Sequence, residues 1–367
     1  MSGRKPDLRA YGMTGRERLT AILQRRPTDR LSWSVLADGH TLGACPGLSF
    51  HDFCRQLGCE ILSLNGWGTP HGFASPALEW SEGVEAKAWT EGDATTWELR
   101  SPEGALRSVW RGSHPVKYYV ETLEELWLYR SMWEGARYVE RDDREAFRAI
   151  DDLLGDDGVI TRFWGPSTIP RLLETDFGVQ SFYYLLHDHP REMEDLIALI
   201  HEREMEAFRI LARGPWESVT LVENTSTYYI SPDVYRRYNG PHVRDFVEAT
   251  HAGGKVAILH MCGHVRNLLE QIKDTGADGS HALTPPPTGD TPWELALDVL
   301  GEDTIIFGTL DPTLWVLGPI EKIGEALDRL ITPRVRRAHF SLLVGADGIR
   351  VPVERFETVA RWMEANG

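Results

Sequence analysis

Lys255-Val-Ala-Ile-Leu-His-Met-Cys-Gly263 is a short apolar run that ends in a histidine, a cysteine and a glycine. Its length and its β-branched residues are typical of a buried strand. Helical periodicity follows over 264–273, and a second apolar run follows over 278–283. The stretch is therefore predicted to form one strand–helix–strand unit of a parallel sheet.

The same alternation continues on both sides of this unit. Further strands are expected at 31–36, 60–64, 158–164, 218–223, 304–307 and 337–343. Helices are expected at 190–212, 293–300, 320–330 and 353–365, and one more is expected to begin at the N-cap Ser231. Eight such strands predict the α/β class and a (β/α)8 TIM barrel. The alternative, an open doubly wound sheet, usually has a glycine-rich phosphate turn, and no G-x-G-x-x-G or Walker sequence occurs.

The stretch from about 84 to 112 has a different pattern. Polar and apolar residues alternate there, and Ser101-Pro-Glu-Gly104 is a turn signal between two alternating runs. An antiparallel hairpin or small meander, inserted after the second barrel strand, is therefore expected. Because no repeat or linker is visible, residues 1–367 are interpreted as a single domain.

Composition excludes several function classes. The net charge is −16 and the basic residues are scattered, so no nucleic-acid surface is expected. No apolar run approaches the roughly 20 residues that a membrane-spanning helix needs. The first residues are charged and do not resemble a signal peptide, so a cytoplasmic location is expected. Four cysteines in 367 residues do not form a disulfide scaffold.

In a (β/α)8 barrel, functional side chains gather where strands end and the following loops begin. Several polar residues occupy such positions here. We interpret Glu223, His281 and Asp311 as catalytic candidates, and we interpret as substrate-binding candidates Asn65, Trp164, Asn224 and Tyr228. Five of them also have a structural interpretation: Glu223 and Asn224 as capping groups, His281 as a core residue, Asp311 as a turn residue, and Trp164 as a packing residue.

His260 and Cys262 stand two residues apart at a predicted strand end, so both can point to one side. Imidazole and thiolate are preferred zinc ligands, and a catalytic zinc commonly has three protein ligands. The alternative is a core histidine beside a buried thiol.

Five short motifs, in order, resemble the uroporphyrinogen decarboxylase superfamily over roughly residues 15 to 365. They are the Ser101-Pro-Glu-Gly104 turn, Ile230-Ser-Pro-Asp-Val234, Leu259-His-Met-Cys-Gly263, Thr275-Gly-Ala-Asp278 and Gly308-Thr-Leu-Asp-Pro312. Within that superfamily the chain is most similar to the zinc-dependent methyltransferases that serve corrinoid proteins. The arginine-rich segment of the tetrapyrrole decarboxylases has no counterpart in residues 34–39, so that reaction is not expected.

The resemblance implies a zinc ion held by His260, Cys262 and a later cysteine. The matching loop, Leu343-Val-Gly-Ala-Asp-Gly348, contains no cysteine, and either Ala346 or Asp347 takes its position, depending on one gap. Asp347 is the expected third ligand, and its alternative is a plain turn residue. Glu223 or His281 could also complete the set. Without a third ligand, His260 and Cys262 would act as acid, base or nucleophile instead.

The first expectation is a zinc-dependent methyltransferase that moves a methyl group between a small methylated substrate and a corrinoid protein or thiol. The corrinoid would belong to a partner protein, as the resemblance implies. The alternatives are a decarboxylase or lyase of a small carboxylic acid, and a noncatalytic binding protein on the same barrel. A homodimer is compatible with the fold, but no sequence feature requires it.

Overall fold

The computed structural model describes residues 12–43, 45, 47–346 and 348–367. Eight parallel strands form one sheet in the order β1-β14-β13-β12-β11-β10-β9-β2. They are β1 (Ser32–Ala37), β2 (Ile61–Leu64), β9 (Gly158–Trp164), β10 (Ser218–Val222), β11 (Val256–His260), β12 (Gly279–Leu283), β13 (Ile305–Thr309) and β14 (His339–Ala346).

The two edges of this sheet meet and close a barrel. A parallel bridge joins Ser34 of β1 to Glu60, just before β2, and the Glu60 amide donates a hydrogen bond to the Trp33 carbonyl at 3.0 Å. The predicted α/β class and (β/α)8 TIM barrel are therefore confirmed, and the alternative prediction of an open doubly wound sheet is wrong.

The amino end of the barrel is filled by apolar side chains beneath helix α1 (Gly15–Leu23). The helix begins with a capping box, in which Thr14 and Glu17 exchange hydrogen bonds with each other's backbone amides. Leu19, Ile22 and Leu23 of α1 are buried in one cluster with interior strand residues, namely Leu62, Val159, Ile258, Ile305 and Phe307. This end is closed, so an open site can form only at the opposite, carboxyl end of the strands.

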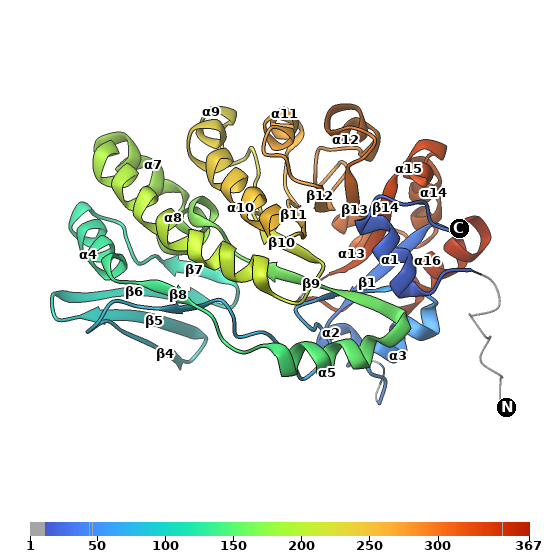
Figure 1. Ribbon diagram of the computed structural model, residues 1–367, viewed down its shortest axis with the longest axis horizontal. Coiled ribbons are helices and arrows are strands. Elements are labelled where there is room, and N and C mark those ends of the chain that lie inside the picture. The colour runs from blue at the N-terminus through green and yellow to red at the C-terminus, as the bar shows by residue number, and fades with distance from the viewer. Residues whose placement is uncertain (1–11, 44, 46, 347) are drawn as a thin grey trace.

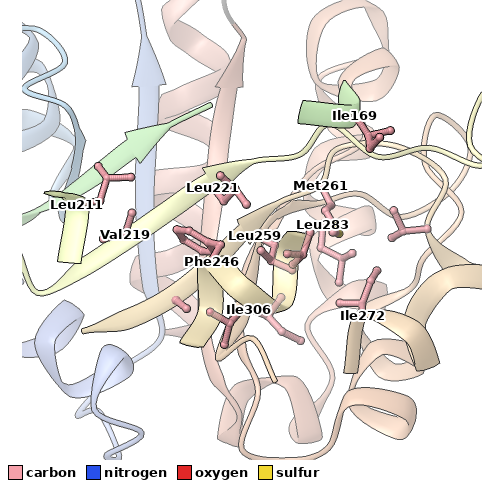
Figure 2. Packing of buried hydrophobic residues seen from close by; sticks show 14 of the residues in the cluster. Ile169, Leu211, Val219, Leu221, Phe246, Leu259, Met261, Ile272, Leu283 and Ile306 are labelled. Atoms are coloured by element: carbon pink, nitrogen blue, oxygen red, sulfur yellow. The ribbon is translucent and has the colours of Figure 1, made fainter. Parts of the chain in front are cut away.

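Outward-facing strand residues pack against the surrounding helices, above all α8 (Pro190–Arg213) and α10 (Gly240–Ala252). Figure 2 shows Leu221 and Leu259 beside Phe246 of α10, and Met261 in the same buried cluster. The strand alternation that buries Leu259 and Met261 outside the barrel places His260 between them on the inner face.

The inserted region lies between β2 and β9. Strands β4 (Glu85–Glu91), β5 (Ala94–Ser101), β6 (Gly104–Arg111) and β7 (His114–Lys117) form an antiparallel meander, which we call the inserted sheet. The predicted meander is thus present, and it extends to Lys117 rather than 112. Strands β3 (Ala77–Glu79) and β8 (Arg137–Val139) pair antiparallel beside it. In Figure 1 the inserted sheet lies at the far left, with α4 (Leu123–Glu134), whereas α16 (Val353–Asn366) lies at the opposite end.

The remaining helices complete the outer layer. They are α2 (Gly39–Leu42), α3 (Phe50–Leu57), α5 (Arg144–Leu154), α6 (Thr168–Arg171), α7 (Gly178–Asp188), α9 (Pro232–Val234), α11 (Leu269–Lys273), α12 (Trp293–Leu300), α13 (Pro312–Leu317), α14 (Glu321–Leu330) and α15 (Pro333–Arg337), with π-helical turns η3 (Leu172–Asp176) and η4 (Tyr235–Asn239) and 3-10 turns η2 (Gly155–Asp157) and η5 (Arg266–Leu268). The helix expected over 264–273 is thus the 3-10 turn η5 followed by the short α11. Across the residues that the structure describes, no helix has the length and apolar content to cross a membrane.

Candidate active site

Two histidines meet inside the barrel near the carboxyl ends of neighbouring strands. His260 of β11 pairs in register with His281 of β12, and their Nδ1 atoms lie 2.8 Å apart. Phe163 of β9 packs edge-on against both rings, with centroid separations of 5.1 Å to His260 and 5.4 Å to His281. This aromatic wall fixes the orientation of both imidazoles.

Both imidazoles are neutral at neutral pH. Burial lowers the pKa of His260 to about 4, and burial and the neighbouring His260 ring lower the pKa of His281 well below its ordinary value. A neutral imidazole carries one proton, so only one ring can donate across the Nδ1–Nδ1 contact. If His260 is the donor, its Nε2 carries a free lone pair. The buried Nε2 of His281 has no hydrogen-bond partner among the described residues.

Cys262 follows at the rim of the barrel. Met261 is buried in the outer core, whereas the Cys262 side chain is exposed, with its Sγ 3.9 Å from Oδ1 of Asn224. Desolvation by the surrounding protein and the nearby Glu174 carboxylate raise the pKa of the Cys262 thiol. The thiol is therefore protonated at neutral pH unless a bound metal or a base removes its proton.

Asn224 belongs to a polar group that reaches the neighbouring turn η3. Its backbone adopts a left-handed φ of 45°, and its Nδ2 donates to Glu174 Oε2 at 3.2 Å. The Tyr229 hydroxyl contacts Glu174 Oε1 at 3.3 Å and also the Asn224 carbonyl. Burial raises the pKa of Glu174. Glu174 was not identified from the sequence, because no motif marks a turn between two helices as part of a site.

Glu223 lies fully buried behind this group. Its carboxyl group accepts hydrogen bonds from the Ser167 hydroxyl and from Nδ2 of Asn239, the latter at 2.6 Å. Burial raises the pKa of Glu223 to about 8 even though both hydrogen bonds favour the charged form. Glu223 therefore joins the loop after β9 to η4, and it is held as a neutral acid at neutral pH.

Two other candidates, Asp311 and Asn65, make structural hydrogen bonds within the barrel. Asp311 caps α13, because its oxygens accept from the amides of Leu314 at 2.9 Å and Thr288 at 2.7 Å. Asn65 ties β2 to β9: its amide donates to the Phe163 carbonyl at 2.7 Å and accepts from the Phe163 amide at 2.8 Å. The structure does not bring either side chain into contact with His260 or Cys262.

The last two candidates lie apart from the histidine pair. Trp164 is half-buried on the outer side of β9, in edge-on contact with Tyr138 and Phe208, each at 5.7 Å between centroids. Tyr228 is exposed at the rim, where its ring lies 4.0 Å from that of His264. Of the sequence candidates, the structure thus groups His260, His281, Cys262 and Asn224.

His260 and Cys262 carry two of the donor types that bind zinc in proteins. Across the described ranges, no three His, Cys, Asp or Glu side chains are placed to hold one metal ion. Asp347, the expected third ligand, lies outside the described residues. The neighbouring Gly348 amide donates to Asp38 Oδ2 at 2.7 Å, so the loop after β14 is tied to the carboxyl end of β1.

Comparisons with known proteins show the family to which the chain belongs. The sequence model of uroporphyrinogen decarboxylase (URO-D) matches residues 145–365. A methyltransferase from Methanosarcina mazei has a similar structure, with a TM-score of 0.58 and 15% identity over 96% of this chain and 99% of that chain. A D-psicose 3-epimerase matches with a TM-score of 0.36 and 12% identity, over 62% of this chain and 83% of that chain. No curated protein matches the sequence. The sequence match covers more than half of the chain, including both histidines and Cys262, and the chain therefore belongs to the uroporphyrinogen decarboxylase family.

Proposed function

We propose that this protein is an enzyme that moves a methyl group between a small methylated substrate and a thiol or a corrinoid carried by a partner protein. The observation that carries the proposal is that an oriented neutral imidazole, His260, and an exposed thiol, Cys262, stand two residues apart at one strand end. Family membership supports an enzyme on this barrel, and the fold shared with a methyltransferase along nearly the whole chain is compatible with methyl transfer.

The chain's own residues would have distinct tasks. His281 Nδ1 would accept a hydrogen bond from the Nδ1–H of His260, which leaves the lone pair of His260 on Nε2, directed away from the pair. Cys262 would present its sulfur to the mouth of the barrel. Glu174 would hold Asn224 beside that sulfur through the 3.2 Å hydrogen bond. Phe163 would exclude water from the inner side of the histidine pair.

Zinc fits the donor types of His260 and Cys262, and Asp347 is the proposed third ligand. The exposed Cys262 thiol is protonated at neutral pH by itself, which is a reason for a metal at this position. When bound, zinc would lower the pKa of a thiol and hold it as a thiolate.

Metal analysis of the purified chain by plasma mass spectrometry tests the ligand set. We expect about one zinc per chain in the wild type and its loss in Cys262→Ala, His260→Ala and Asp347→Ala. Cys45→Ala is the matched control, since this free cysteine lies far from β11 in the sequence, and it should retain the metal. Equal zinc content in Cys262→Ala and the wild type would contradict the assignment.

Methyl transfer is measured separately, with methylcobalamin and 2-mercaptoethanol as probes. The expected products are the methyl thioether and cob(I)alamin, which is followed by its absorbance. A metal-free protein that transfers no methyl group, and instead releases carbon dioxide from small carboxylic acids, would replace the proposal with the lyase alternative.

A further inference from the structure

The inserted sheet has two faces with different surroundings. On its inner face, Trp97 and Leu99 of β5 pair with Ser108 and Leu106 of β6. Leu99 and Leu106 are buried in the main core, so this face is directed toward the rest of the protein. Trp97 shares that face and is nevertheless 50% exposed. The core therefore covers only half of the inner face.

The uncovered half forms one wall of a cavity of about 320 Å³ that is open to solvent. Trp97, Ser108 and Trp110 come from the inserted sheet, Tyr119 comes from the segment between β7 and α4, and Thr175 comes from η3. Three aromatic side chains from two separate segments thus surround one open space. Across the described residues, no ring contact is found among these three aromatic side chains, so they do not fill the space by packing on one another.

Three polar side chains of this cavity, Trp110, Ser108 and Thr175, have hydrogen-bond partners within the protein. The Trp110 indole donates to the Ser108 hydroxyl at 2.9 Å, and that hydroxyl donates to the Lys117 carbonyl at 3.1 Å. The Thr175 hydroxyl lies 2.7 Å from the Arg171 carbonyl. None of the five lining residues carries a charge. A ligand would therefore meet aromatic rings rather than ionic groups.

We propose that this cavity binds the uncharged aromatic ring of a small molecule. Offset and edge-on ring contacts would hold it, and no hydrogen bond or counter-ion is needed. An apolar cavity of about 150 Å³ is large enough for benzene, so this one has room for a substituted ring. The lack of a carboxylate in the lining favours a neutral ring over a quaternary ammonium ion. The inference is independent of the proposed methyl transfer, because it concerns binding alone.

Two tryptophans of the same sheet provide a matched pair of variants. Trp97 is on the inner face, whereas Trp89 of β4 pairs with Thr96 on the outer face, beneath the guanidinium of Arg107. Both are partly exposed, at 50% and 37%, so neither substitution removes a buried core residue. Circular dichroism and thermal unfolding would establish that both variants are folded.

Titration of the full chain with 4-fluorophenol, followed by fluorine NMR at pH 7, tests the proposal. We expect saturable binding that Trp97→Ala weakens about fivefold or more and Trp97→Phe largely retains. Trp89→Ala should leave the affinity unchanged. Cyclohexanol, a ring of similar size without π electrons, should displace the probe poorly.

Several results would overturn the proposal. They are the absence of saturable binding, equal weakening by Trp97→Ala and Trp89→Ala, and displacement by cyclohexanol as effective as by phenol. If tetramethylammonium displaced the probe, the ligand class would be a cation rather than a neutral aromatic ring. Because the assay requires no turnover, failed methyl transfer and failed ring binding are distinguishable.

Discussion

The two ends of the barrel surround a buried carboxyl group in opposite ways. At the amino end, Glu60 contacts the guanidinium groups of Arg18 and Arg30, and it also accepts from the Trp33 amide at 2.9 Å. At the carboxyl end, the side-chain donors to Glu223 among the described residues are the neutral groups of Ser167 and Asn239, and burial raises its pKa to about 8.

This difference distinguishes polar groups that stabilise the fold from the candidate site residues. A buried charge is compatible with folding where cations and amides compensate it, as around Glu60. The carboxyl end instead retains neutral or incompletely bonded groups, such as the Nε2 of His281 and the exposed Cys262 thiol. Groups left in that state are available to a ligand or a metal, and they contribute little to stability.

Removal of the exposed thiol should give the largest effect on activity. Cys262→Ala is expected to reduce kcat/KM for methyl transfer at least about 1000-fold, which corresponds to roughly 4 kcal/mol. Because the side chain is exposed, the free energy of unfolding should change by less than about 0.5 kcal/mol. Steady-state kinetics and urea denaturation measure the two quantities. If the free energy of unfolding of Cys262→Ala fell by several kcal/mol, the thiol would be a structural group, and the contrast between the two ends of the barrel would be wrong.

Loss of the compensated carboxylate should mainly affect stability. Glu60→Ala leaves Arg18 buried with Asp29 as its remaining acidic partner, and it is expected to lower the free energy of unfolding by about 3 kcal/mol. Urea denaturation at pH 7 measures this change. The control Glu85→Ala removes an exposed pair with Lys87 and should have no measurable effect. Equal stability of the two variants would show that the pairing around Glu60 is unimportant.

A third buried carboxyl group, Glu204, tests how the free energy of unfolding depends on pH when cations and donors compensate a buried charge only weakly. Burial raises the pKa of Glu204 on α8 to about 7, although Arg171 and Thr168 oppose the rise. The folded state then binds more protons than the unfolded state between pH 4.5 and 7. Its stability should therefore fall as the pH rises through that range, by about 3 kcal/mol for this group.

Glu204→Gln should remove this part of the pH dependence while it retains an oxygen for Thr168. Urea denaturation of both proteins from pH 5 to pH 8 gives the difference directly. We expect the variant to gain stability relative to the wild type as the pH rises. Parallel curves would mean that Glu204 has the same pKa in both states.

The smallest predicted effect concerns the positioning residue His281. His281→Phe removes the partner of His260 Nδ1 and should reduce activity and metal affinity about 10-fold. Stability should change little, because the loss of the unpaired Nε2 of His281 is offset by the buried Nδ1 of His260 that the substitution leaves without a partner. His281→Gln keeps an acceptor for His260 and should retain more activity. An unaffected metal content in His281→Phe would exclude the positioning role.

Local patterns alone predicted much of the architecture. Alternation of short apolar runs with helical periodicity gave eight strands within a few residues of their observed bounds, since side-chain period depends only on neighbouring residues. The period-two pattern near Trp97 predicted the inserted meander for the same reason. The His260-x-Cys262 spacing directed attention to the end of β11, and the motifs around it indicated the family that the sequence comparison confirmed.

Only the tertiary structure decided which residues meet. The contact between His260 and His281 depends on the register of β11 and β12, and the contact between Asn224 and Glu174 depends on the packing of η3 against β10's loop. Trp97 lines an open cavity whose other walls include Tyr119 and Thr175, which are distant from it in the sequence. Periodicity specifies the face on which a side chain lies, whereas closure of the barrel and docking of the inserted sheet determine what lies opposite that face.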